Sequence, residues 1–378
     1  MKYRAFVGGA VTLAAAGVLL AACAAPTPTP IQPHSSAATT PTPSPAAASA
    51  PGSRVPPGCA ELLDFANVQA LAGQNAKVEQ DEHSAPTRIL PIAQLQYGAE
   101  GCIWDGESTG AGTTPGSSLS VTVAPDAKVE FGTRFAELMT ATTSSPHPAA
   151  TENVAGDESG FWCATDLDAL GEDGPSLICD AEMLVGDYWV SIEIGNVSGF
   201  TRAQLTAGLA TAMSDIATRL VAAGPAPAQW VAPATTPPGF CTDSNNTASV
   251  RTILGDQTLA AYPAEGRSVY AATIGLLGRD AYCSWTSPTY GSLDVELLAG
   301  GSWVFPGFAP VAPGDSIVQS YAPVTVAGVS SALMGCAEGG CEAFLAVGTT
   351  MVQIDMDDLG RAKDLAVLAA FAKAIAAS

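Results

Sequence analysis

The chain has 378 residues, of which 13% are charged and 47% are hydrophobic, and its formal net charge is −21. This acidity excludes polyanions, nucleic acids among them, as general partners, because charges of the same sign repel. The length exceeds what a single hydrophobic core usually organises, so two folded domains are expected.

Residues 1–23 are typical of a bacterial lipoprotein signal peptide. A basic start, with Lys2 and Arg4, precedes an apolar run from Ala5 to Leu20. This run of about 16 residues is shorter than the roughly 20 that a transmembrane helix needs, and a short anchor helix is the alternative. The run ends in Leu20-Ala21-Ala22-Cys23, which matches the lipobox at which such signals are cut and the cysteine is acylated. We therefore expect a mature chain of net charge −23, lipid-anchored through Cys23 on the outer face of the cell membrane.

Residues 24–57 are predicted to form a disordered tether. Proline, threonine, serine and alanine dominate this segment. Such a composition cannot bury enough apolar surface to offset the entropy lost on ordering. At about 3.1 Å per residue the tether would reach on the order of 100 Å, so we expect the folded part to stand away from the membrane.

Two later segments, residues 58–224 and 239–378, share one layout and are joined by a Pro/Ala-rich linker at residues 225–238. Cys59 precedes Cys102 by 43 residues, and Cys241 precedes Cys283 by 42. The second cysteine of each pair begins a Cys-x-Trp motif. Self-similarity of this kind is the signature of duplicated units, so the sequence predicts two tandem repeat domains.

Each copy is predicted to be an α+β domain with the element order α-β-β-α-β-β-β-α. Helices are expected near residues 60–71, 129–140 and 247–254, and long amphipathic helices close the copies at residues 200–220 and beyond 365. The strands at residues 189–194 and 351–356 alternate apolar and polar side chains, which is typical of antiparallel strands with one buried and one solvated face. Gly186-Asp187 and Gly348-Thr349 are predicted hairpin turns. The pattern favours an antiparallel sheet in each copy, with helices packed mainly on one face.

Eight cysteines remain after Cys23, four in each copy: Cys59, Cys102, Cys163 and Cys179, then Cys241, Cys283, Cys336 and Cys341. Outside the cytoplasm, even counts at repeated spacing favour disulfides. Of the three pairings possible within each copy, we favour the first cysteine with the second and the third with the fourth. The first bridge of each copy would contribute about 3–4 kcal/mol by loop closure. Zinc ligation through Cys336 and Cys341 is the competing interpretation, but no histidine follows His147, and we predict neither a metal nor another cofactor.

Phe161, Trp162 and Trp189 form a candidate binding patch. Trp189 falls on the polar face of its predicted strand, and exposed aromatic side chains beside an acidic segment are typical of binding surfaces. The alternative, which we favour, is burial of these side chains beneath a loop.

Two motifs suggest chemistry but lack essential parts. The acidic stretch at residues 166–173 resembles a calcium loop, yet Leu170 and Leu177 stand where an EF-hand needs oxygen ligands. A solvated acidic loop is favoured there, and a looser calcium site stays open. The segment 106–110 matches the Gly-x-Ser-x-Gly nucleophile elbow around Ser108, but a Gly/Thr/Ser/Pro loop follows instead of the helix that this motif requires. We therefore predict a non-enzymatic protein with no catalytic residue.

The two copies differ in charge. The balance is −17 between Ala60 and Gly224 and −7 from Pro225 to the end of the chain. A cationic partner would therefore bind the first copy in preference to the second. The alternative is a surface that only maintains solubility.

The lipobox, the Thr-Pro tether and the Cys and Cys-x-Trp layout together resemble actinobacterial cell-envelope lipoproteins with tandem Cys-rich extracellular domains of unknown function. The layout is also distantly similar to the extracellular sensor domains of mycobacterial-type serine/threonine kinases. This resemblance implies a binding, adaptor or sensor role in the cell envelope, with an unidentified protein or small ligand as partner. A carrier of an apolar envelope ligand is the second hypothesis, and a serine hydrolase is the third.

Overall fold

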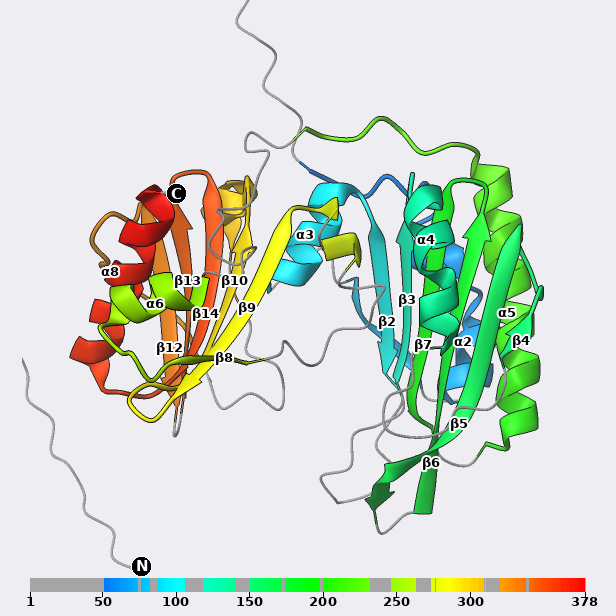
Figure 1. Cartoon of the computed structure of the whole chain (residues 1–378). Coiled ribbons are helices and arrows are strands. Elements are labelled where there is room, and N and C mark those ends of the chain that lie inside the picture. Colours follow the sequence, from blue (N-terminus) through cyan, green and yellow to red (C-terminus); the bar gives the residue numbers. More distant parts are fainter. Residues whose placement is uncertain are drawn as a thin grey trace, which may run out of the picture. The chain divides into compact units, whose positions relative to one another are not determined.

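Two antiparallel sheets of seven described strands each follow one another along the chain (Figure 1). The computed structural model describes residues 51–73, 76–81, 88–105, 118–140, 150–171, 174–197, 200–231, 246–262, 273–275, 277–308, 310, 320–337 and 340–377. The described residues, which begin at Pro51, all belong to one compact unit. The α+β class with two tandem antiparallel sheets, predicted from the alternation of apolar and polar residues, is confirmed.

The first sheet has the strand order β1-β2-β3-β7-β6-β5-β4. Its strands are β1 (Lys77–Asp81), β2 (Glu100–Asp105), β3 (Ser118–Ala124), β4 (Thr151–Glu152), β5 (Glu158–Gly171), β6 (Gly174–Val185) and β7 (Tyr188–Val197). All neighbouring pairs are antiparallel. The turn at Gly186-Asp187 joins β6 to β7 as predicted, with Gly186 in the left-handed region at φ 61°.

The second sheet repeats this order strand for strand, as β8-β9-β10-β14-β13-β12-β11. Its strands are β8 (Ala260–Tyr262), β9 (Asp280–Ser287), β10 (Gly291–Leu298), β11 (Ala322–Pro323), β12 (Ser331–Ala337), β13 (Gly340–Val347) and β14 (Thr350–Asp357). The outermost strands of both sheets, β1 and β4 in the first and β8 and β11 in the second, were not predicted, because each is short and carries little alternation.

The helices of the first half are α1 (Cys59–Leu62), α2 (Phe65–Ala72), α3 (Ile89–Tyr97), α4 (Lys128–Thr140) and α5 (Arg202–Ala223). Those of the second half are α6 (Asn246–Leu254), the 3₁₀ helix η1 (Gly301–Gly307) and α8 (Arg361–Ala377). Pro306 lies inside η1, at the position where the first half forms α4, and proline is incompatible with a regular α-helix interior.

The two long closing helices each cover one face of a sheet. The apolar stripe of α5, which includes Leu205, Leu209 and Ile216, packs with Val190 and Ile192 of β7 in one core. A capping box formed by Thr201 and Gln204 fixes the start of α5. In the second half, α8 packs on its sheet in the equivalent way.

The opposite face of each sheet was predicted to be solvated, and this prediction is wrong. Ser191 and Glu182 in the first sheet and Gln353 and Glu342 in the second are all buried. Trp189 packs with Phe131 of α4 and with Ile274, whereas Met351 packs with Ile92 of α3. The alternation of polar and apolar residues is real, but helices cover part of the second face of each sheet as well, although Glu193 on that face of β7 stays exposed.

The hydrophobic clusters on this second face of each sheet contain residues from both halves of the chain. Ile274 of the second half lies in the core of the first sheet, and Ile89 and Ile92 of the first half lie in that of the second. The Gln96 side-chain amide donates 2.8 Å hydrogen bonds to the carbonyl oxygens of Gly278 and Ala299. The two sheets are therefore held by reciprocal contacts as well as by the linker.

Disulfides join Cys59 to Cys102, Cys163 to Cys179 and Cys336 to Cys341, as the favoured pairing predicts. Cys283 is disulfide-bonded as well, and its predicted partner, Cys241, lies outside the described residues. The first bridge ties α1 to β2, and the other two clasp adjacent strands at matched register positions.

The tether was predicted to run to residue 57, but ordered packing begins earlier. Arg54 is buried, and Val55 lies in the same core as α5. The Arg54 backbone N–H donates to the Gly98 carbonyl oxygen at 2.8 Å, and its Nε donates to that of Pro227 at 2.6 Å. The last residues of the predicted tether are therefore part of the fold.

Candidate ligand-binding site

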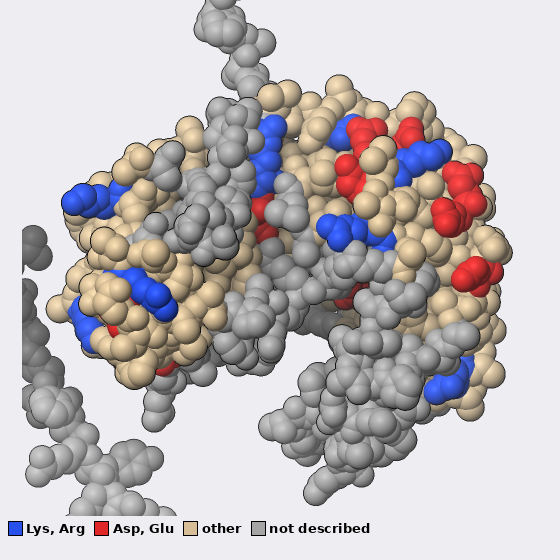
Figure 2. All heavy atoms as spheres, in the orientation of Figure 1, with Lys and Arg blue, Asp and Glu red and all other residues tan. Residues whose placement is uncertain are grey.

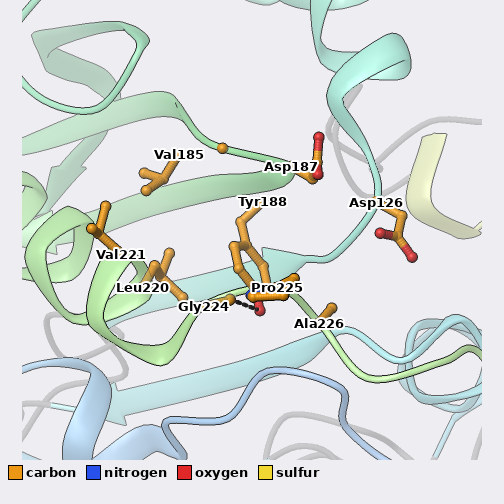
Figure 3. A pocket seen from close by; sticks show the side chains of 10 residues that line it. Asp126, Val185, Asp187, Tyr188, Leu220, Val221, Gly224, Pro225 and Ala226 are labelled. Atoms are coloured by element: carbon orange, nitrogen blue, oxygen red, sulfur yellow. Dashed lines mark hydrogen bonds between the residues drawn. The ribbon is translucent and has the colours of Figure 1, made fainter.

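A small pocket lies where two turns of the first half meet the C-terminal end of α5 (Figure 3). The β6–β7 turn contributes Gly186 and Asp187, and the β3–α4 turn contributes Asp126. The Ala127 N–H donates a 3.0 Å hydrogen bond to the Asp187 carbonyl oxygen, which ties the two turns together. The Tyr188 hydroxyl donates to the Gly224 carbonyl oxygen at 2.9 Å, which fixes the end of α5 against the sheet.

The pocket has an apolar wall and an acidic rim. Val185, Leu220 and Val221 lie on one side of Tyr188, and the carboxyl groups of Asp126 and Asp187 lie on the other (Figure 3). Its volume is about 240 Å³. This size suits a small group or a side chain, because drug-sized ligands occupy about 300–1,000 Å³.

Asp126 adopts a backbone conformation that non-glycine residues rarely take. Its φ is 55°, and the equivalent turn of the second half has Gly300 there, at φ 77°. The left-handed conformation costs a non-glycine residue about 1 kcal/mol, which Asp and Asn tolerate best. Strain of this order is typical of positions where a side chain serves a purpose besides folding.

The second half lacks both acids of the rim. Gly300 occupies the position of Asp126, and Thr349 occupies that of Asp187 in the matching hairpin turn. The acidic pocket is thus specific to the first half, which also carries the larger share of negative charge. Over the face shown in Figure 2, most visible acidic side chains gather over elements of this half.

The electrostatic potential in the pocket is negative. Burial raises the pKa of Tyr188, and Asp126 and Asp187 raise it further. Burial likewise raises the pKa of Tyr97, with Glu130 and Asp126 contributing. Arg54 forms an ion pair with Asp126 and partly offsets this potential. A cationic group at the rim would be attracted by the same carboxylates.

A second acidic feature repeats in both sheets. Asp180 faces Glu193 across β6 and β7, and Glu342 faces Asp355 across β13 and β14. Burial and the neighbouring carboxylate raise the pKa of Asp180 to about 7, and the same causes raise that of Asp355 to about 7. Like charges opposite each other in a sheet destabilise it, so one proton per pair is favourable near neutral pH.

Glu182 lies beside the first of these pairs. Its carboxyl accepts hydrogen bonds from Trp189 Nε1 at 2.6 Å and from the Ser191 hydroxyl at 2.9 Å. Burial is the largest cause that raises the pKa of Glu182 well above its usual range. The sequence pattern alone did not reveal this network, because its residues were expected to face solvent.

The candidate aromatic patch is not a surface patch. Phe161, Trp162 and Trp189 are all buried, with exposures of 2%, 6% and 0%. Phe161 lies in the core beneath α5, whereas Trp189 is covered by α4 and Ile274. Burial was the favoured alternative, but helices rather than a loop cover Trp189.

Among the residues that the structure describes, two clusters of cysteines and carboxylates come close enough to hold a metal ion. They are Cys59, Glu100 and Cys102, and Cys336, Cys341 and Asp364. In both clusters the cysteines are joined as disulfides, so their sulfur atoms are not thiolate ligands.

Several predicted features lie outside the described residues: Cys23 and the rest of the signal peptide, Ser108, Cys241 and the tip of the acidic stretch at residues 172–173. Residues 166–171 of that stretch continue strand β5 and do not form a loop. The acidic segment was therefore predicted wrongly in its conformation, because its alternating residues extend the β5–β6 hairpin.

No family model, curated protein or solved structure matches this chain. Within the described residues, none of the helices combines the length and the apolar character that crossing a bilayer demands.

Proposed function

We propose that this protein is an extracytoplasmic lipoprotein, anchored to the membrane through Cys23, with a non-enzymatic binding or adaptor role in the cell envelope. The lipobox and the Thr-Pro tether support the location. The resemblance to tandem Cys-rich envelope lipoproteins supports the class.

The ligand that the pocket suits best carries a cationic head on a short apolar group. The observation behind this assignment is the acidic rim of Asp126 and Asp187, which the second half replaces with Gly300 and Thr349. The carboxylates would attract the cation, and Leu220 with Val221 would contact the apolar group. A lysine side chain of a partner protein and a free alkylamine share this chemistry.

A carrier of an apolar envelope ligand is supported less well. The acidic pocket is smaller than a lipid chain requires and lies at the end of α5. A larger hollow of about 590 Å³ lies beside α8, but it is a shallow surface lined mainly by alanine.

Binding of hexylammonium, measured by titration calorimetry at low salt, tests the ligand class. The Asp126→Asn/Asp187→Asn double variant should weaken binding about tenfold or more, because each charge-assisted contact contributes about 1.5–3 kcal/mol. Asp357→Asn/Asp358→Asn removes two exposed carboxylates in the second half and serves as the charge-matched control. Equal loss in both variants would show that only the net charge attracts the amine.

The anchor is tested separately by Cys23→Ser. The variant should leave the membrane fraction and appear in the soluble extracellular fraction. Retention in the membrane would contradict the lipid anchor and leave the pocket assignment untouched.

A further inference from the structure

The three disulfides whose two cysteines the structure describes differ in access from solvent. Cys59, Cys102, Cys163 and Cys179 are all buried. Cys336 is exposed, whereas its partner Cys341 is only 3% exposed. An external thiol can therefore reach one sulfur of the Cys336–Cys341 bridge while the other stays inside the protein.

A carboxyl group lies against the buried sulfur. Asp364 Oδ2 is 3.9 Å from Cys341 Sγ, and Asp364 itself is completely buried in α8. Its Oδ1 accepts a 3.1 Å hydrogen bond from the Leu359 N–H, which fixes the orientation of the group. While the disulfide is intact Cys341 has no proton, so the contact becomes a hydrogen bond only when that bond opens.

The position of Asp364 is unusual when the two closing helices are compared. It is the fourth residue of α8, and the fourth residue of α5 is the buried Leu205. Burying a carboxyl group costs free energy that a leucine does not cost. The second half thus has a carboxyl group where the first half has only an apolar contact.

The charges around Asp364 are mixed. Burial raises the pKa of Asp364, and Asp358 raises it as well, whereas Arg361 and Lys363 lower it. Arg361 Nη1 lies 3.8 Å from Met334 Sδ. Met334 is two residues from Cys336 on β12, so Arg361 lies toward the face of the strand that carries Cys336. A cation there favours the approach of an anionic thiolate.

We propose that the Cys336–Cys341 bridge is a thiol-exchange site, with Cys336 as the sulfur that an external thiolate attacks and Asp364 as the proton donor to Cys341. The inference does not depend on the ligand-binding role of the first half.

The exchange needs no reactant other than the external thiol. The incoming thiolate forms a mixed disulfide with Cys336 Sγ, the Cys336–Cys341 bond breaks, and Cys341 leaves with the electron pair. Asp364 then gives its proton to the Cys341 thiolate and becomes a carboxylate. A buried thiolate in apolar surroundings is a poor leaving group, so this protonation speeds the step. The reverse reaction restores the bridge and releases the thiol.

The first half supplies an internal control. Glu100 Oε1 lies 3.4 Å from Cys59 Sγ, so that disulfide also has a neighbouring carboxyl group. Both of its cysteines are buried, however, so an external thiol has no access. The Cys59–Cys102 bridge should therefore not exchange with an external thiol, although Glu100 lies beside it.

To test this proposal, the full chain is incubated with reduced glutathione, and the reaction is stopped with acid at several times. Free thiols are then alkylated, and peptide mass spectrometry measures how much of each bridge has opened. We expect the Cys336–Cys341 bridge to open at least about tenfold faster than Cys59–Cys102, and glutathione to be found on Cys336. Asp364→Asn should slow opening about a hundredfold, which is the lower end of what general acid catalysis contributes. With the rate normalised to thiolate concentration, opening should slow with rising pH in the parent protein and not in the variant.

Simultaneous opening of both bridges, or glutathione on Cys341, would overturn the proposal. An unchanged rate in folded Asp364→Asn would show that Asp364 only fixes the start of α8. Circular dichroism of the oxidised variant establishes that it is folded. If the variant does not fold, the proposal is tested in the parent protein alone, by the order in which the bridges open and by the cysteine that carries glutathione.

Discussion

Gly278 lies against Ala93 so closely that a Cβ atom on the glycine would come within 2.1 Å of the Ala93 carbonyl oxygen. Ala93 belongs to α3 of the first half, and Gly278 follows the helical residues around Ile274 in the second. The reciprocal packing of the two halves depends on this close approach.

Gly278→Ala should therefore destabilise the protein. Overpacking against a backbone atom typically costs about 1–3 kcal/mol. Gly132→Ala is the matched control, because a Cβ at that helical position meets no atom within 4 Å and alanine favours helices. Urea denaturation measures both variants. Equal stability of Gly278→Ala and the parent would argue against the contact.

Stability should rise as the pH falls from 8 to 5. The pKa of Asp180 and that of Asp355 are both about 7 in the folded protein, against about 4 in an unfolded chain. Between these values the folded state binds more protons, so its stability increases on acidification. Denaturation at several pH values should show this slope. Asp180→Asn and Asp355→Asn should flatten it, and a slope unchanged in both would contradict the assignment.

Two replacements of Glu182 should distinguish the contribution of its hydrogen bonds to stability from that of its charge. Glu182→Gln preserves an oxygen acceptor for Trp189 and removes a buried ionisable group, so its stability at pH 8 should equal or exceed that of the parent. Glu182→Ala leaves the Trp189 N–H without its 2.6 Å partner and should cost about 1–3 kcal/mol. Thermal unfolding ranks the three proteins, and a Gln variant less stable than the Ala variant would exclude this network.

Asp126→Gly should lower both the stability of the protein and its affinity for hexylammonium. Glycine relieves the left-handed strain at φ 55° but removes the carboxylate that pairs with Arg54. Because Arg54 is buried, the loss of its partner leaves an unpaired buried charge and costs about 3 kcal/mol, whereas the relieved strain is only about 1 kcal/mol, so stability should fall. Hexylammonium binding should still weaken. Loss of stability without loss of binding would assign Asp126 a structural role only.

Much of the fold could be predicted because its signals are local. The alternation around Val190 and Ile192, the glycine at position 186 and the cysteine spacing each report on short-range geometry or on covalent chemistry. These signals correctly indicated the hairpins, the closing helices and three described disulfides.

The outer faces and the pocket depend on contacts between distant segments. Nothing near Trp189 in the sequence indicates that Ile274 will cover it. Helix α3, with Pro91 in its first turn, was missed because proline reads as a helix breaker, although the first turn tolerates it. The pocket combines Asp126 with a turn about 60 residues later and with the end of α5 about 100 residues later. The left-handed φ of Asp126 has no sequence signature beyond its residue type.

The most direct test of the account is a chemical-shift map of the mature chain titrated with hexylammonium, with hexanoate as the matched anion. The account predicts saturable shifts centred on the Gly186, Asp187 and Gly224 amides with the amine and none there with the acid. Shifts of equal size with both ligands, or shifts confined to the second half, would contradict it.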